Sequence, residues 1–229
     1  FTVSWIDYLS SKGRGISMAG NFEQKTRKTL ANPAQGGLQL SVPFYFPGWA
    51  LNKLSVQMFN NLYFKKQTQK EITVRPHFEP FFYPLDSVLN WNRIYGRRGF
   101  YQYQFCLPHT ADNGVLKKIV HIISQSGFAS FLSVMKNFGA STSPGMLSFP
   151  AEGITLAMDF ANLGKPLLDL FTTLDQLVLD GNGRLYPAKD GRMPEWMFKK
   201  CYPNWEKFKQ WQDPKFSSSF WRRVTGESK

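Results

Sequence analysis

The chain has 229 residues, of which 42% are hydrophobic and 16% aromatic, and it carries a formal net charge of +12. This composition indicates a folded globular protein with room for one sizeable domain or two small ones, and it excludes a disordered chain. No apolar run approaches the roughly 18 residues of a transmembrane helix. The basic excess also lacks the basic helix, strand signature or zinc-finger spacing typical of nucleic-acid-binding domains.

Cysteine and histidine placement bounds the chemistry further. The two cysteines, Cys106 and Cys201, are far apart in the sequence, so we interpret them as free thiols in a reducing compartment. His77, His109 and His121 have no metal-ligand spacing, and no metal site is predicted. Because no signal peptide is recognisable, we expect a cytoplasmic protein, with a peripheral position at the inner membrane as a second option. The chain begins with Phe inside a predicted strand, so we expect a piece of a longer protein.

The first part of the chain predicts strands, loops and one long helix. We expect a β-hairpin from residues 1–9 and 15–22, because a Gly/Ser/Lys turn separates two extended runs. A polar loop over 23–37 and an extended run over 38–46 follow. Residues 49–66 predict an amphipathic helix. Its apolar stripe consists of Leu51, Leu54, Ser55, Met58, Phe59, Leu62 and Tyr63.

Prolines dominate the segment that follows. Residues 71–85 are predicted to be extended, because prolines interrupt the run. Asp86 can cap a short helix that Gly96 ends. That helix is expected to contain Val88, Leu89, Trp91 and Ile94.

The second half of the chain is more regular and predicts the order β-α-β-β-α-β over residues 99–189. The expected elements are a strand at 99–108, a helix at 112–127, strands at 128–138 and 153–160, a helix at 164–183 and a strand at 184–188. This order is the ferredoxin-like pattern of an antiparallel sheet with two helices on one face, so the predicted fold class is α+β. Residues 190–229 predict a tail of short helices.

Strand alternation assigns side chains to the two faces of this sheet. Gln102 and Gln104 alternate with tyrosines, and Thr155, Ala157 and Asp159 alternate with apolar residues. Since the helix-covered face must be apolar, these polar sets are expected on the open face. Lys136 and Tyr186 lie at predicted strand ends, so the open face is predicted to be a ligand wall.

Sequence motifs of complete enzymes are missing from the chain. It contains no G-x-S-x-G motif, no G-x-G-x-x-G on a strand-to-helix turn and no P-loop. Its carboxylates are too scattered to nominate an acid and base pair. We therefore do not expect the chain to be active alone.

Several ordered blocks carry a family resemblance. They are "YFPGWALNKLSVQMFNNLYF", "FFYPLDSVLNWNRIYGRRGFYQYQF", "FLSVMKNFG", "GMLSFPAEGITLAMDF" and "GRLYPAKDGRM". Together they resemble the C-terminal half of FAD-linked oxidases of the vanillyl-alcohol-oxidase type, nearest to the branch that oxidises polyprenyl-phosphate sugars. The resemblance covers nearly the whole chain and implies a substrate-binding domain over 1–229, divided into 1–98, 99–189 and 190–229. It also implies that the N-terminal FAD-binding domain, which makes most FAD contacts, is absent from this chain.

The resemblance implies a set of site residues. The substrate-binding positions of the family fall on Gln102, Gln104, Lys136, Phe138, Thr155, Ala157 and Phe82. Its catalytic and cofactor-binding positions fall on Tyr186 and Lys189. This chain departs from the nearest branch at Thr155, where an Asn is expected, at Ala157, where a cysteine is expected, and at Phe82, where a tyrosine is expected.

The implied function is the oxidation of a CH–OH group in a sugar, a polyol or a polyprenyl-phosphate sugar by hydride transfer to the N5 atom of FAD. Lys189 would stabilise the reduced flavin, Lys136 would hold hydroxyl or phosphate oxygens, and the glutamines could donate to sugar hydroxyls. The implied partners are the chain's own FAD domain and a reductase. The alternative is a non-catalytic binding module that uses the same sheet face. Asp190 and Arg192 would either brace the loop or meet the missing domain.

Overall fold

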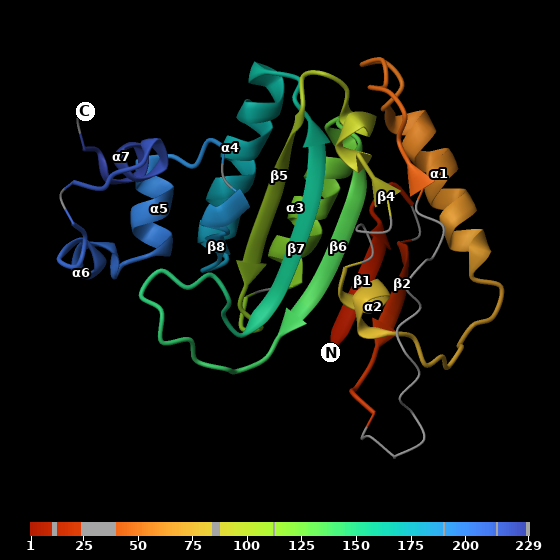
Figure 1. Ribbon diagram of the computed structural model, residues 1–229, viewed down its shortest axis with the longest axis horizontal. Helices are drawn as coiled ribbons and strands as arrows, with labels where there is room; N and C mark the ends of the chain where they lie inside the picture. The colour runs from red at the N-terminus through yellow and green to blue at the C-terminus, as the bar shows by residue number, and fades with distance from the viewer. Residues whose placement is uncertain are drawn as a thin grey trace.

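A computed structural model describes residues 1–10, 13–23, 40–83, 88–111, 113–189, 191–213 and 215–227. Within these residues the main sheet is antiparallel and has six strands in the order β2-β1-β6-β7-β5-β8 (Figure 1). The strands are β1 (Thr2–Asp7), β2 (Arg14–Ala19), β5 (Phe100–Leu107), β6 (Ser130–Phe138), β7 (Gly153–Ala161) and β8 (Arg184–Leu185). The predicted α+β class is confirmed, with β5, β6, β7 and β8 in the expected order along the chain.

Two long helices cover one face of this sheet. They are α3 (Asn113–Gln125) and α4 (Lys165–Asp180), and Figure 1 shows α3 behind β5 and β7. Side chains of both helices, among them Ile119, Ile123 and Leu174, share one hydrophobic cluster with the inward residues of β5 and β7. None of the described helices combines the length and apolar character that crossing a bilayer requires.

The pairing of β5 with β7 separates apolar from polar side chains as the alternation predicts. Eight positions pair in register, from Phe100 with Ala161 to Leu107 with Ile154. Position 153, where β7 starts, requires a glycine, because a Cβ atom there would lie 2.1 Å from the Leu107 carbonyl oxygen. The inward residues Tyr103, Phe105, Leu107, Leu156, Met158 and Phe160 are all buried. Each fully buried apolar side chain contributes about 1.5–3 kcal/mol, so this row fixes which face points away from the helices.

The predicted N-terminal hairpin is confirmed, and it extends the sheet. β1 pairs with β2 and also with β6, so the hairpin adds to the free edge of the core strands. Trp5 pairs with Val134, and Val134 pairs with Ala157, so these three residues share the face opposite α3 and α4.

Helix α1 (Lys53–Lys66) packs on this hairpin through a side that only partly overlaps the predicted one. Asn52 caps the helix, which starts four residues later than expected. Val56 and Asn60 are buried, and the Asn60 amide donates to Asp7 over 2.7 Å. Of the predicted apolar stripe, Leu54, Met58 and Leu62 face outward, with exposed fractions of 67%, 59% and 69%. Phe59 and Tyr63 of the same stripe pack inward, against Phe131 and Trp5. The helix is apolar on two sides, and the polar pairing with Asp7 selects the side that is buried.

The segment between α1 and β5 differs from the prediction in two places. Residues 78–82, expected to be extended, form helix α2 (Phe78–Phe82), whose start is capped by the His77 side chain. Val88 and Leu89, expected to be helical, form β4 (Val88–Leu89), which pairs in parallel with β3 (Leu40–Ser41) because a backbone partner is available there.

The second part of that predicted helix exists as the 3-10 helix η2 (Trp91–Tyr95), which Gly96 ends with φ +74. The predicted loop over 23–37 lies outside the described residues after position 23, and so do the capping residues Asp86 and Asp112.

The C-terminal tail joins the main core. Helices α5 (Glu195–Cys201) and α7 (Ser219–Thr225) place apolar side chains in the same hydrophobic cluster as the sheet, and α6 (Trp205–Lys209) lies between them in the chain. The Tyr202 hydroxyl donates to the carbonyl oxygen of Leu185 over 2.6 Å. Cys106 and Cys201 are both buried free thiols, as predicted, and burial raises the pKa of Cys201 to about 11.

A buried ion pair ties the loop after β8 to α4. Arg192 donates to both carboxylate oxygens of Asp175 over 2.7 Å, and the Tyr103 hydroxyl donates to the same carboxylate over 2.9 Å. The guanidinium group also lies over the rings of Tyr103 and Phe171. Of the two roles considered for Arg192, the structure supports bracing of the loop. Asp190 lies outside the described residues.

Loss of this brace is expected to destabilise the protein. Arg192→Ala should lower the free energy of unfolding by about 3–5 kcal/mol, because the fully buried Asp175 charge loses its counter-charge. Urea denaturation of the purified protein measures the change. As a matched control, Lys165→Ala removes an exposed ion pair with Asp169 and should change stability by less than about 1 kcal/mol. Equal losses in the two variants would contradict a structural role for the buried pair.

Candidate functional site

The candidate site lies on the sheet face that α3 and α4 do not cover. Strand register places Gln104 beside Ala157, and Thr155 between Cys106 and Lys136, so their side chains share this face. Gln102 pairs with Asp159 one row further along. The structure therefore brings together the predicted site residues of β5, β6 and β7, as the alternation required.

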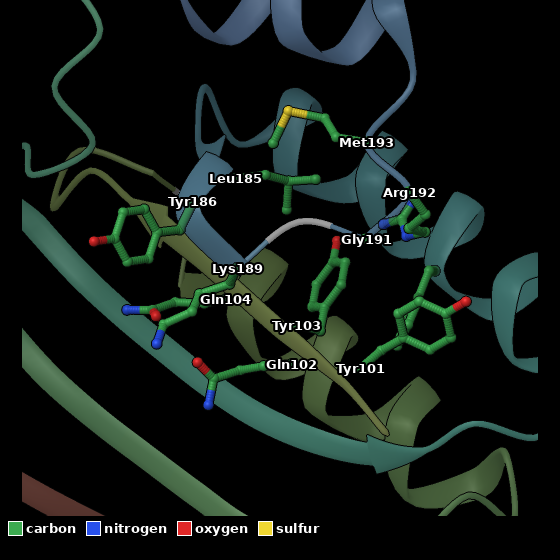
Figure 2. Close-up of a pocket in the computed structure, with 11 residues that line it drawn as sticks. Tyr101, Gln102, Tyr103, Gln104, Leu185, Tyr186, Lys189, Gly191, Arg192 and Met193 are labelled. Atoms are coloured by element: carbon green, nitrogen blue, oxygen red, sulfur yellow. The ribbon is translucent and has the colours of Figure 1, made fainter. Parts of the chain in front are cut away.

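The loop after β8 brings two more of them to the same place. Tyr186 donates its backbone N–H to the carbonyl oxygen of Gln104, which ties the loop to the edge of β5. The 3-10 helix η3 (Pro187–Lys189) then carries Lys189, whose side chain is exposed. Figure 2 shows Gln102, Gln104 and Lys189 on one side of β5, and Tyr101, Tyr103 and Arg192 on the other.

The hollow at this strand edge is small. A cavity of about 20 Å³, lined from both sides of β5 and by Gly191, is large enough for about one water molecule. A ligand of sugar size would therefore not fit inside this cavity.

An aromatic row borders the face on the side of β8. The Tyr186 ring stacks on Phe149 with centroids 4.4 Å apart, and Phe149 meets Phe138 edge-on at 6.0 Å. Phe149 is buried and comes from the loop between β6 and β7. The place of Phe149 at this face was not predicted from the sequence, because nothing in the loop pattern distinguishes a packed phenylalanine from an exposed one.

Phe82 lies in a separate aromatic group. Its ring contacts Phe1 at 5.1 Å and Phe22 at 6.2 Å, and it borders Phe81 within α2. This group sits by the start of β1, and β6 and β7 separate β1 from the strand that carries the glutamines. The expectation that Phe82 belongs to the substrate site stays a prediction.

Asp159 is the most unusual group on this face. Its carboxylate is fully buried, and Oδ1 accepts a hydrogen bond from Gln102 Nε2 over 2.6 Å. The Tyr95 hydroxyl faces this carboxyl. Within the described residues, neither that hydroxyl nor Asp159 Oδ2 has a partner in good hydrogen-bonding geometry. Helix η2 supplies Tyr95 and covers this end of the face, so the face is less open than predicted.

Burial and nearby groups act on Asp159 in opposite directions. Burial raises the pKa of its carboxyl to about 6, and the Gln102 hydrogen bond, the Lys189 charge and Tyr95 oppose that shift. Asp159 was assigned to this face from the sequence but not to the site. The sequence signal that could have assigned Asp159 to the site is that it is a single acidic residue in an otherwise largely apolar strand.

The glutamine amides are committed to neighbours on the sheet. Gln104 Nε2 donates to Thr155 Oγ1 over 3.2 Å, and the Thr155 hydroxyl donates to the carbonyl oxygen of Phe105 over 2.8 Å. Thr155 is buried, whereas Lys136 is exposed on the neighbouring strand. The arrangement is a polar wall with two lysines at its margins, suited to a ligand that carries hydroxyl groups and negative charge.

Comparisons with known proteins agree with the resemblance read from the sequence. The chain is 33% identical to decaprenylphosphoryl-beta-D-ribose oxidase of Mycolicibacterium smegmatis over 237 aligned residues, which cover 98% of this chain and 51% of the oxidase. It is 31% identical over 143 residues to an uncharacterized protein in the mprA 5′ region of Streptomyces coelicolor, covering 60% of this chain and 38% of that protein. No family model matches the chain. The resemblance to an FAD-linked oxidase is thus confirmed, and the chain spans about half the length of the oxidase it matches.

The buried Asp159 carboxyl predicts an unusual dependence of stability on pH. The folded protein holds this proton up to about pH 6, whereas the unfolded chain releases it near the ordinary value of 3.8. The folded state therefore binds more protons between these values, and the free energy of unfolding falls as pH rises through this window. Relative to Asp159→Asn, wild type should lose roughly 2 kcal/mol between pH 4 and pH 7.

Urea denaturation at a series of pH values measures this difference. Asp7→Asn is the control, because Asp7 is also buried in the sheet but forms an ion pair with Arg14 at 2.8 Å. That variant should be less stable than wild type at neutral pH, whereas Asp159→Asn should be more stable. Equal stability of wild type and Asp159→Asn at both ends of the pH range would contradict the assignment.

Proposed function

We propose that this chain is the substrate-binding part of an FAD-dependent oxidoreductase that oxidises a CH–OH group of a sugar, a polyol or a polyprenyl-phosphate sugar. The observation that carries the proposal is the match to the mycobacterial oxidase along 98% of this chain. The polar wall of β5 and β7 supports it, because its amides suit hydroxyl groups and its lysines suit phosphate oxygens. Since the chain spans about half of that oxidase, most FAD contacts would come from a further domain.

The residues at the end of β8 fit a flavin. Bound FAD would supply a hydride acceptor, and its reduced form carries negative charge. Lys189 is exposed at the edge of the polar wall, and within the described residues it has no ion pair that would neutralise it. Its ammonium group can lie beside the flavin and stabilise that charge. Tyr186, held by the stack with Phe149 and the bond to β5, offers a fixed ring and a hydroxyl at the same edge.

The remaining wall residues bind and orient the substrate. Gln102 and Gln104 contact its hydroxyl groups, and Lys136 holds hydroxyl or phosphate oxygens from the β6 side. Phe138 closes the wall towards the loop between β6 and β7. Ala157 is small, so it leaves room between Val134 and Gln104 for a sugar ring.

A lipid-linked substrate has consequences for partners and location. The name of the mycobacterial relative refers to a decaprenylphosphoryl sugar, so a polyprenyl carrier is part of the proposal. A substrate of this kind is held in a membrane, so the location we propose is the cytoplasm, with a peripheral position at the inner membrane. A partner reductase that consumes the ketone product would complete an epimerisation.

The full-length protein that contains this chain tests the proposal. It should purify with FAD, and its flavin should be bleached anaerobically by one class in a panel of polyols, phosphorylated sugars and short-chain polyprenylphosphoryl sugars. A protein that purifies without flavin and cannot be reconstituted would rule out the oxidase, and the binding-module interpretation would then replace it.

Lys189 is predicted to matter for flavin reduction. In the full-length protein, Lys189→Ala should slow anaerobic flavin reduction about 100-fold, because a charge that stabilises the reduced flavin is lost. Stopped-flow absorbance measures the rate. Lys165→Ala is the control, since Lys165 is an exposed lysine at the start of α4 and pairs with Asp169. Equal rates in the two variants would contradict the role assigned to Lys189.

A further inference from the structure

The two glutamines of the polar wall are each held from behind by a buried group. Gln102 Nε2 donates to Asp159, and Gln104 Nε2 donates to Thr155. Asp159 is fully buried and Thr155 is 2% exposed, so neither partner can move away without disturbing the sheet. Both glutamines are half-buried, and within the described residues neither Oε1 accepts a hydrogen bond.

The chemistry of the two buried partners fixes the direction of both amides. An ionised carboxylate can only accept, so Gln102 must turn its N–H group towards Asp159. A hydroxyl has a single proton, and Thr155 donates it to the Phe105 carbonyl oxygen, so its oxygen can only accept from Gln104. Reversing either amide would place two oxygen acceptors together and leave both unsatisfied.

Asp159 differs from the other buried carboxylates of the described chain. Asp7 has Arg14 and Asn60 as direct partners, and Asp175 has Arg192 and Tyr103. The direct partner of Asp159 is an amide, and no arginine lies against it among the described residues. A buried charge held by an amide is costly, and the amide that Asp159 orients is that of Gln102, which belongs to the polar wall.

We propose that Asp159 and Thr155 are positioning residues that fix Gln102 and Gln104 with their carbonyl oxygens towards the ligand, so that the wall accepts hydrogen bonds from neighbouring hydroxyl groups. The two glutamines lie two residues apart on one face of β5, about 7 Å along the strand. The favoured ligand therefore presents hydroxyl donors to the strand, as a furanose ring or an open polyol does. This reverses the direction expected from the sequence, in which the glutamines donated to the sugar.

The surroundings of Asp159 make the orientation sensitive to pH. The groups that face its carboxyl are Gln102 from β5, Tyr95 from η2 and the charge of Lys189 from η3. When the carboxyl gains a proton it becomes a donor, and Gln102 is then free to turn its oxygen inward. Burial raises the pKa of Asp159 to about 6, which sets the midpoint expected for this change.

Side-chain amide NMR tests the orientation without any substrate. In full-length protein labelled with ¹⁵N-glutamine, the Gln102 NH₂ resonances should shift with pH around a midpoint near 6. The shift should disappear in Asp159→Asn and persist in Asp7→Asn. A Gln102 signal that is the same in wild type and in Asp159→Asn at every pH from 3 to 8 would overturn the proposal, whatever the protein catalyses.

Kinetics test the consequence for the ligand, and this arm depends on the proposed function. With a short-chain polyprenylphosphoryl-β-D-ribose as probe, Asp159→Asn and Thr155→Val should each raise KM about tenfold, the loss expected for one hydrogen bond. The KM of wild type should rise below pH 6, and that of Asp159→Asn should not depend on pH. Thr155→Ser keeps the hydroxyl and should restore the wild-type KM, and Asp7→Asn should leave KM unchanged.

The outcomes separate the two proposals. If wild type fails to reduce its flavin with any probe, the proposed function fails, and the NMR result still decides the amide orientation. If wild type reacts while Asp159→Asn keeps the wild-type KM and pH profile, the positioning role is wrong and the proposed function stands.

Discussion

The pairing of β5 with β7 is the constraint on which the rest of the structure depends. Their eight paired positions put one row of side chains into the core and the alternate row on the polar wall. Because side chains alternate with a period of two, a slip of one residue would exchange the two rows. Tyr103 and Phe105 would then face the ligand, and the glutamines would face Ile119 and Leu174. The hydrophobic row thus fixes the register, and the register fixes the site.

Buried charge is used in two ways around this strand pair. Asp7 and Asp175 join segments that are far apart in the chain, and each does so with an arginine as its direct partner. The side chain of Asp159, on β7, points between β5 and η2, and its direct hydrogen-bond partner on the described chain is the Gln102 amide. Its Oδ2 atom and the Tyr95 hydroxyl remain incompletely bonded among the described residues. The first two carboxylates contribute to the scaffold. The third is predicted to lower stability at neutral pH, which is the pattern expected where a site is built at the expense of the fold.

The sequence predicted the parts of the fold that rest on simple periodicity. Strict alternation in β5 and β7 located the wall residues, and Gly127 and Gly181 mark the ends of α3 and α4 as expected. The orientation of α1 could not be predicted, because Leu54 and Val56 offer competing apolar sides and a tertiary contact to Asp7 decides between them. The position of β4 depends on pairing with β3, which lies far away in the chain and carries no local signal.

The candidate site shows the same division between local and long-range information. Gln102, Gln104, Thr155 and Ala157 were correctly assigned to the open face because a strand places every second residue on one face. The functional polarity of that face was not predictable, since it depends on which atoms the buried neighbours use. A glutamine carries an NH₂ group at one end of its amide and a carbonyl oxygen at the other, and only the buried partner shows which end turns towards a ligand. Two carbonyl oxygens with lysines at the margins favour a ligand that donates hydroxyl hydrogens in the middle and carries negative charge at its end. An apolar ligand would leave both oxygens and both lysines without partners, so the wall itself selects against one.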